Sequence, residues 1–186
     1  MDLLLFGIQG SGKGTQAKRL AAEFCYDIFE AGGELRKIAA SGSALGVKVK
    51  SFIDQGILVP HEIIMQVVKE AISKRAKTTK ILFDGIPRDE NQKKDFDAIM
   101  AEVGRDFACI HILLDPEEGV QRIFGRAKQE GRADDSNEEI IRRRMKTFTE
   151  KTLPVIAIYK AQGKVTEIDG MQKEDAVYGE IKNALR

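Results

Sequence analysis

Short, mostly apolar runs alternate with longer amphipathic segments along the whole chain. The short runs are typical of buried β-strands and lie at residues 3–6, 26–29, 81–83, 107–114 and 165–168. In the segments between them, apolar residues recur every three or four positions, which predicts helices that each bury one face. Strands that alternate with helices form parallel sheets covered on both faces. We therefore expect an α/β fold: a three-layer sandwich around a five-stranded parallel sheet.

Proline and glycine set several of the expected boundaries. Residues 30–33 contain two glycines and are expected to form a loop before the next helix. Pro60 can start a later helix, because its fixed φ suits the first helical turn. A long helix is expected from about Asn137, and Pro154 is expected to break it because proline lacks a backbone N–H.

The first strand leads into a glycine-rich turn, Gly-Ile-Gln-Gly-Ser-Gly-Lys-Gly-Thr-Gln at residues 7–16. A strand, a glycine-rich turn and a helix in this order form the context of a phosphate-binding loop. Glycines let successive backbone N–H groups point at an anion, and the helix N-terminus adds its dipole. Lys13 can add a charge on the outer phosphates, and Thr15 offers a hydroxyl near a phosphate-bound Mg²⁺. A lysine between two glycines is poor helix chemistry, which argues against a simple turn with one surface lysine.

A second group of polar residues follows the third apolar run. Asp84 comes directly after this run, so it is expected at the sheet edge where the phosphate loop lies. It could hold waters of a phosphate-bound Mg²⁺, although Asp-Gly pairs are also common in turns. Arg88 has no helical partner in the sequence, and its planar guanidinium suits a second phosphate group.

Three arginines further along the chain lie in different surroundings. Arg122 and Arg126 are four residues apart on one expected helix, so they share a face, and an anion between them would relieve their repulsion. Arg132 lies in a polar segment beside Gly131. These positions are candidates for binding an anion.

Helix geometry separates the next three arginines, which are consecutive. Glu138 and Glu139 lie four residues before Arg142 and Arg143, which predicts ordinary ion pairs on the helix surface. Arg144 instead shares a face with the apolar residues of this helix. It is therefore expected to point toward the core, where a guanidinium needs an anionic partner.

Composition narrows the classes of function. The 186 residues include 30 basic and 29 acidic side chains, a net charge of +1, which is not the profile of a protein that binds nucleic acid or a membrane surface. Cys25 and Cys109 are far apart, so neither a zinc site nor a disulfide framework is expected. No apolar run approaches about 20 residues, and no signal peptide precedes the first strand. We expect a cytoplasmic protein.

The sequence contains no recognisable pair of a nucleophile and a base. His61 lies at an expected helix start, and His111 lies within an apolar strand as an expected core residue. An acceptor that is already a phosphate needs no base, because its attacking oxygen is anionic and only alignment and charge stabilisation are required. One lysine, several arginines and Mg²⁺ therefore fit transfer from phosphate to phosphate.

As a set, these motifs resemble the adenylate kinase family in its form with a short lid. They are residues 7–16, the Asp-Gly-Ile-Pro-Arg segment 84–88 with Gln92, Gly125-Arg126, the segment 131–135, Arg144 and the Pro-Val-Ile segment 154–156. The resemblance runs nearly end to end and implies a single P-loop kinase domain over residues 1–186. Its core (1–29, 60–125 and 138–186) would carry two small mobile inserts, an acceptor-binding insert at 30–59 and a short lid at 126–137. The resemblance also implies Mg²⁺ with ATP, no structural zinc, and a monomer.

The resemblance implies a role for each matching residue. ATP would be bound by Gly10, Ser11, Gly12, Lys13, Gly14, Thr15, Arg122, Arg126 and Gln172. The acceptor nucleotide would be bound by Ala31, Arg36, Ile57, Leu58, Val59, Gly85, Ile86, Pro87, Arg88, Gln92, Arg132 and Arg144. Mg²⁺ would be held through water by Thr15 and Asp84. The catalytic residues would be Lys13, Arg88, Arg126, Arg132 and Arg144.

Two positions indicate different acceptor nucleotides. Residues 30–33 read Glu-Ala-Gly-Gly, where adenylate kinases usually have Ser-Thr-Gly-Asp, and Ala31 resembles the UMP/CMP kinases. Gln92 resembles the adenylate kinases, and its amide can meet an adenine edge with one donor and one acceptor. We give Gln92 more weight because it would touch the base, and we expect reversible transfer from ATP to AMP that gives two ADP.

The alternative within the family is a UMP/CMP kinase that uses ATP as donor. A non-catalytic nucleotide sensor would leave the lid arginines without a use. A simple ATPase would need a water-orienting glutamine with a switch loop, and no motif of that kind is visible.

Overall fold

The computed structural model describes residues 1–130 and 137–185, and of residues 126–130 it describes only the backbone. The described residues form a five-stranded sheet in which every pair of neighbouring strands is parallel, in the order β2-β3-β1-β4-β5. The expected α/β fold with a five-stranded parallel sheet is confirmed. The strands are β1 (Asp2–Gly7), β2 (Tyr26–Glu30), β3 (Lys80–Asp84), β4 (Phe107–Leu113) and β5 (Val165–Asp169).

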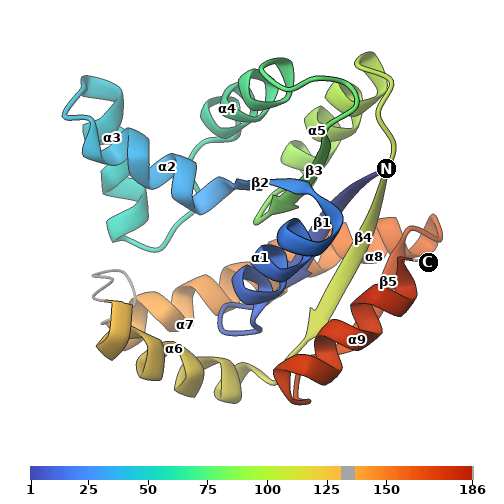
Figure 1. The fold of residues 1–186 in the computed structure, drawn as a ribbon. Coiled ribbons are helices and arrows are strands. Elements are labelled where there is room, and N and C mark those ends of the chain that lie inside the picture. Colours follow the sequence, from blue (N-terminus) through green and yellow to red (C-terminus); the bar gives the residue numbers. More distant parts are fainter. Residues whose placement is uncertain (131–136, 186) are drawn as a thin grey trace.

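Helices connect the successive strands, as Figure 1 shows. They are α1 (Lys13–Phe24), α2 (Ala31–Ala40), α3 (Ala44–Asp54), α4 (His61–Ser73), α5 (Glu90–Glu102), α6 (Pro116–Glu130), α7 (Glu138–Thr147), the π-helix η2 (Phe148–Thr152), α8 (Leu153–Ala161) and α9 (Glu174–Ala184). Among these described helices, none combines the length and the apolar character needed to cross a lipid bilayer.

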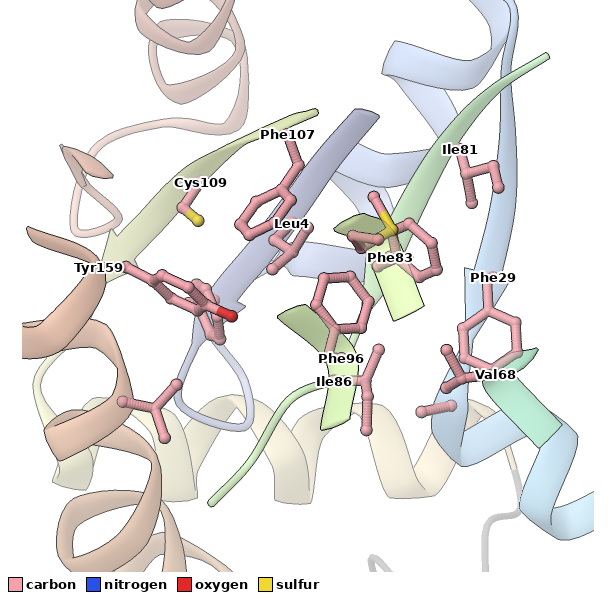
Figure 2. Packing of buried hydrophobic residues seen from close by; sticks show 14 of the residues in the cluster. Leu4, Phe29, Val68, Ile81, Phe83, Ile86, Phe96, Phe107, Cys109 and Tyr159 are labelled. Carbon is pink, nitrogen blue, oxygen red and sulfur yellow. The ribbon is translucent and has the colours of Figure 1, made fainter. Parts of the chain in front are cut away.

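Successive side chains of each strand pack on opposite faces of the sheet. From β1, Leu4 and Phe6 pack in a cluster with buried residues of α4, α5 and α8 (Figure 2), in which Phe96 of α5 is fully buried. Leu3 and Leu5 pack instead with buried residues of α1 and α9. Helices therefore cover both faces of the sheet, and its strands are apolar on both sides because neither face meets water.

The expected loop at residues 30–33 is wrong. β2 continues to Glu30, and α2 begins directly afterwards at Ala31. Glu30 is the register partner of Asp84 at the end of β3, and Ala31 is only 2% exposed. Tertiary packing therefore carries both glycines of this segment into the helix, against their weak helix propensity.

The expected break at Pro154 is also wrong. The chain stays helical from Glu138 to Ala161, and the π-helix η2 lies directly before the proline. Proline supplies no N–H, and its ring crowds the carbonyl one turn back. The wider π turn accommodates the proline, so the helix continues past it.

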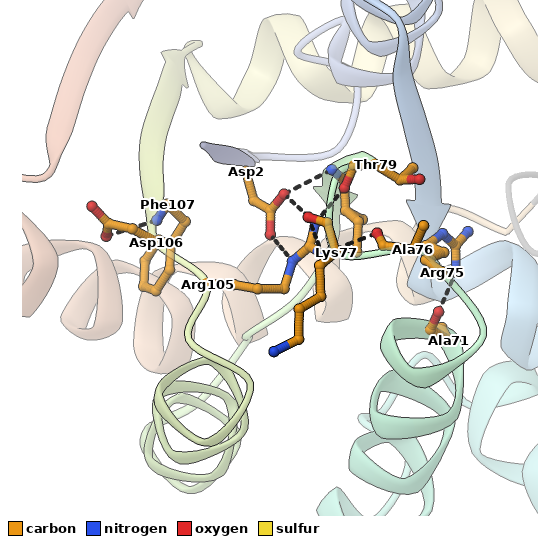
Figure 3. Close-up of polar contacts among 10 residues, drawn as sticks. Asp2, Ala71, Arg75, Ala76, Lys77, Thr79, Arg105, Asp106 and Phe107 are labelled. Atoms are coloured by element: carbon orange, nitrogen blue, oxygen red, sulfur yellow. Dashed lines mark hydrogen bonds and ion pairs between the residues drawn. The ribbon is translucent and has the colours of Figure 1, made fainter.

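A buried ion pair lies at the amino ends of the strands, on the edge opposite the phosphate loop. Nε and Nη2 of Arg105 donate to the two carboxylate oxygens of Asp2 at 2.6 and 2.8 Å. The same carboxylate accepts the backbone N–H of Ile81 at 2.8 Å, and Arg105 also donates to the carbonyl of Thr79. Figure 3 shows these contacts. The side chains of Asp2 and Arg105 are 3% and 9% exposed. The network ties the segments before β3 and β4 to the start of β1.

Candidate functional site

A pocket, which we call the central pocket, opens at the carboxyl ends of β1, β2 and β3. Parallel strands bring these ends to one edge, where Glu30 pairs in register with Asp84, and Asp84 with Leu5. Among the residues expected from the sequence, those that line it are Gly10, Gly12, Lys13, Ala31, Arg36, Ile57, Leu58, Val59, Asp84, Gly85, Ile86, Pro87, Arg88, Gln92 and Arg144. Residues 80 or more positions apart in the sequence thus meet in one cavity.

The turn between β1 and α1 is shaped by its glycines. Gly10 and Gly12 have φ values of 84° and 87°, in the left-handed region that favours glycine. A Cβ on Gly10 would lie 2.6 Å from the carbonyl oxygen of Gly119, so α6 packs directly against the turn. Ser11 is 4% exposed, and its Oγ has no hydrogen-bond partner among the described residues. A buried hydroxyl of this kind fits a ligand oxygen at this position.

Lys13 begins α1 and folds back over the turn. Its Nζ donates to the backbone carbonyls of Gly7 at 2.7 Å and Ile8 at 3.0 Å. Gly14 and Thr15 follow it in the first turn of α1 and are exposed. The ammonium group therefore lies at a helix N-terminus, where unpaired backbone N–H groups and the helix dipole also favour an anion.

Arg88 is held by hydrogen bonds to three neighbours. Its Nε donates to the carbonyl of Gly85 at 2.7 Å, and its backbone N–H donates to Oε1 of Gln92 at 2.8 Å. Its carbonyl accepts the hydroxyl of Thr152 at 2.9 Å. A Cβ on Gly85 would lie 2.7 Å from Nη2 of Arg88, so the guanidinium lies where only glycine leaves room. Both the backbone and the side chain of Arg88 are thus fixed before any ligand binds.

The electrostatic surroundings of Arg88 favour an anion. Burial, and next the positive charge of Arg144, lower the pKa of the Arg88 guanidinium from its ordinary value, and Arg36 adds to this effect. Asp84 and Glu30 act in the opposite direction. A buried guanidinium beside two like charges gains free energy when an anion compensates its charge.

The three consecutive arginines of α7 lie in different places, as their spacing predicts. Arg142 donates to Glu138 at 2.8 Å and to Glu117 at 2.9 Å, and Arg143 donates to Glu139 at 3.1 Å. Arg144 instead lines the central pocket. Helix geometry alone therefore separates two arginines with surface partners from one that faces the cavity.

The start of α2 supplies Ala31 and Arg36 to the pocket. Ala31 is buried, and Nη2 of Arg36 lies 2.7 Å from Oε1 of Glu30. The segment after α3, with Ile57, Leu58 and Val59, adds an apolar wall. This wall can cover a nucleobase, while Arg36 lies with Arg88 on the polar side.

Arg122 and Gln172, both expected to bind ATP, do not line the central pocket as the described residues define it. Arg122 donates to Glu118 at 2.7 Å and to the carbonyl of Gly170 at 3.1 Å. Gln172 donates to Glu180 at 2.8 Å. Arg122 therefore lies against the segment that follows β5. Arg132 lies outside the described residues, and so does the side chain of Arg126.

Two oxygen-bearing side chains lie where Mg²⁺ could bind, Asp84 and Thr15. Asp84 is 9% exposed and lines the pocket together with Lys13, and Thr15 lies in the first turn of α1. In the part of the chain that the structure describes, no group of three or more histidine, cysteine or acidic side chains is arranged to hold a metal. Mg²⁺ at phosphate sites takes one or two carboxylates, water and the phosphates themselves. The residues present fit an ion of this kind.

Thr152 and Glu30 are polar residues of the pocket that sequence reasoning missed. Thr152 is 64 positions from Arg88, and no periodic pattern predicts that its hydroxyl reaches the Arg88 carbonyl. Glu30 stood out only as a departure from the usual acceptor loop, and its ion pair with Arg36 depends on where β2 ends.

His111 and Cys109 are buried in β4, as expected for core residues. Burial lowers the pKa of His111, whose Nδ1 lies 3.7 Å from Oε1 of Glu167. Burial raises the pKa of the Cys109 thiol to about 12. Both side chains therefore stay neutral near pH 7, and neither lines the central pocket.

Comparisons with known proteins identify the family to which this chain belongs. Residues 5–164 match the family described as adenylate kinase. A protein named adenylate kinase from Thermus thermophilus is 38% identical over 184 residues, which cover 98% of this chain and 96% of its own. Proteins of the same name from Xanthomonas campestris pv. campestris and Caulobacter sp. are 38% and 37% identical over 186 residues, which cover 100% of this chain and 99% and 98% of theirs. The chain therefore belongs to the adenylate kinase family of enzymes.

Proposed function

We propose that this protein catalyses the reversible, Mg²⁺-dependent transfer of a phosphoryl group from ATP to AMP, which gives two ADP. Family membership supports nucleoside monophosphate kinase activity. The observation that carries the proposal is the central pocket, where Lys13, Arg36, Arg88 and Arg144 converge from four different segments of the chain. Two polyanionic nucleotides that meet end to end need such a set of cations around the transferred group.

Each part of the pocket has a task in this reaction. The phosphate loop and Lys13 would hold the donor phosphates, while Arg36 and Arg88 would hold the acceptor phosphate. Arg144 would compensate charge on the group in transit. Mg²⁺ would supply further positive charge on the donor phosphates, with Asp84 and Thr15 holding its waters. No base is required, because the attacking phosphate oxygen is already anionic.

The orientation of the Gln92 amide favours hydrogen bonds to some acceptor bases over others. Its Oε1 accepts the backbone N–H of Arg88, and because a backbone donor requires an acceptor, the assignment of the amide oxygen is fixed. The Nε2 donor therefore remains for a ligand, which narrows the earlier expectation of one donor and one acceptor. The ring nitrogens adenine N1 and cytosine N3 accept hydrogen bonds, whereas guanine N1–H and uracil N3–H donate them. Gln92 thus favours AMP and CMP over GMP and UMP.

The apolar wall supports AMP over CMP. Ile57, Leu58, Val59 and Ile64 line the pocket beside buried Ala31. A purine covers more of such a wall than a pyrimidine, and apolar burial contributes about 25 cal/mol per Å². We therefore propose that the larger base binds with the higher affinity.

A panel of acceptors tests the proposal. Wild-type protein with ATP and Mg²⁺ is assayed for ADP formation with AMP, CMP, UMP and GMP. We expect kcat/KM to be highest for AMP, lower for CMP and lowest for UMP and GMP. A preference for CMP or UMP over AMP would overturn the proposed acceptor. Equal use of CMP and UMP would contradict the role given to Gln92.

We also propose that the segment 30–59 is a mobile insert that closes over the acceptor, whereas the short lid expected at 126–137 lies largely outside the described residues. In Figure 1, α2 and α3 form a pair set away from the sheet. Closure of such inserts would complete the site and exclude water. The roles expected for Arg126 and Arg132 stay predictions, because Arg132 and the side chain of Arg126 lie outside the described residues. The cytoplasmic location and the monomeric state expected from the sequence stay predictions.

A further inference from the structure

The central pocket contains carboxylates as well as cations. Among the described residues that line it, the cationic ones are Lys13, Arg36, Arg88 and Arg144, and the acidic ones are Glu30 and Asp84. Asp84 has a task beside Mg²⁺ in the proposed reaction. Glu30 has none, although a carboxylate near a phosphate-binding site opposes the ligand's charge.

The position of Glu30 is built into the junction of β2 and α2. Its Oε1 lies 2.7 Å from Nη2 of Arg36, with the two side chains 49% and 35% exposed. A Cβ on Gly33 would lie 3.0 Å from Oε2 of Glu30, and a Cβ on Gly32 would lie 3.2 Å from Nη1 of Arg36. The two glycines therefore leave the space in which this ion pair lies.

The ion pair involves the guanidinium that the acceptor phosphate needs. An ion pair between half-exposed side chains contributes little stability, so a ligand can displace it. A phosphate dianion that approaches Arg36 must nevertheless replace the carboxylate or bind close to it, and like charges at such distances repel. The negative charge of Glu30 also raises the pKa of Arg88, the second arginine proposed for this phosphate.

We propose that Glu30 is an internal counter-ion of Arg36, whose carboxylate competes with the acceptor phosphate and lowers the affinity of the site for a dianionic acceptor. The inference rests on the proposed function and extends it to what sets acceptor affinity. A carboxylate that opposes the phosphate equally before and during transfer raises KM and leaves kcat nearly unchanged.

The test compares Glu30→Gln with the wild type, because glutamine keeps the shape and an acceptor oxygen but removes the charge. We expect the dissociation constant and the KM of AMP to fall about ten-fold, with kcat changed less than about two-fold. Adenosine, which has the base and ribose but no phosphate, should bind to both proteins with the same affinity. Calorimetry measures both affinities, and a coupled assay measures turnover.

A matched control is Glu34→Gln. Glu34 lies on α2, as Arg36 does, and pairs with Lys37 at 2.7 Å, but it does not line the central pocket. We expect no change in the affinity for AMP or adenosine. An equal effect of this variant would mean that net charge, and not the position of Glu30, sets the affinity, which would overturn the inference.

Two further outcomes would also overturn it. Weaker binding of AMP to Glu30→Gln would mean that the carboxylate positions Arg36 for the phosphate and does not compete with it. Equal shifts for AMP and adenosine would indicate a structural change at the junction of β2 and α2. Failure of the wild type to phosphorylate AMP would instead contradict the proposed function, while the comparison of the two affinities would still decide the role of Glu30.

Discussion

At the scale of single residues, backbone atoms of neighbouring turns fix the functional side chains. Lys13 donates to the carbonyls of Gly7 and Ile8, and Arg88 donates to the carbonyl of Gly85. Gln92 accepts the backbone N–H of Arg88, and this hydrogen bond fixes the orientation of the Gln92 amide. Backbone atoms move less than long side chains, and preorganised charges need less reorganisation during the reaction.

Replacing Lys13 by methionine should leave the fold intact and lower kcat by roughly 10²–10³-fold. Methionine keeps the unbranched chain but removes the charge from the phosphates. The two lost hydrogen bonds to carbonyls cost only about 1 kcal/mol each. Steady-state kinetics and circular dichroism check both parts of this expectation.

The matched control is Lys18→Met, because Lys18 is an exposed lysine on the same helix. Its kcat should equal that of the wild type. Turnover of Lys13→Met close to the wild-type value would refute the role of Lys13 in the transfer.

At the scale of elements, the π-helix η2 connects the long helix to the turn between β3 and α5, which carries Arg88. Phe148 and Thr152 begin and end η2, and both line the central pocket. Thr152 is 4% exposed, and its hydroxyl donates to the carbonyl of Arg88. One irregular turn thus links the helix that carries Arg144 to the turn that carries Arg88. π turns inside helices often mark functional sites, and here the turn also accommodates Pro154.

Replacing Thr152 by valine should raise the KM of AMP about ten-fold, because valine has the same shape but leaves the Arg88 carbonyl without its donor. An unsatisfied buried carbonyl costs about 1–3 kcal/mol, and 1.4 kcal/mol corresponds to ten-fold. Thr152→Ser keeps the hydroxyl and should restore the KM. Kinetics with varied AMP at saturating ATP measure both variants.

Thr149→Val serves as the control, since the hydroxyl of Thr149 donates to the carbonyl of Met145 within its own helix, at 3.2 Å. Its KM for AMP should not change. If the two valine variants behaved alike, the Arg88 contact would not be the cause of the effect.

At the scale of the whole molecule, the two edges of the sheet have separate tasks. The carboxyl edge carries the central pocket, whereas the amino edge carries the buried pair of Asp2 and Arg105. The hydrogen bonds from Arg105 to Asp2 are the largest cause that raises the pKa of Arg105. Stability at one edge and chemistry at the other can therefore change independently.

Replacing Arg105 by leucine should lower the free energy of unfolding by roughly 3–5 kcal/mol, because it leaves the Asp2 carboxylate buried without its cation. Urea denaturation measures this loss. The kcat of the folded enzyme should stay the same, because the substitution lies at the opposite edge from the pocket.

Lys69→Ala removes an exposed ion pair with Glu102, in which both side chains are more than half exposed. It should leave the unfolding transition nearly unchanged. A similar loss in both variants, or a drop in kcat for Arg105→Leu, would contradict the separation of the two edges.

The succession of strands and helices along the chain, the glycine-rich turn after β1, and the pairs of Arg142 with Glu138 and of Arg143 with Glu139 could all be predicted from the sequence. Each depends on residues close together in the chain, such as a run of apolar positions, a spacing of glycines or a step of four along a helix. The sequence also predicted that Lys13 and Asp84 lie in one site, because the ends of parallel strands meet at one edge of the sheet.

Contacts between distant segments decided what the sequence alone could not. Packing beside β3 turned residues 31–33 into helix, and the π turn carried the helix past Pro154. The hydrogen bond from Thr152 to Arg88 joins residues 64 positions apart. The orientation of the Gln92 amide depends on how the chain folds between β3 and α5. Local propensities are worth less than about 1 kcal/mol per residue, so burial and hydrogen bonds formed in the folded chain override them.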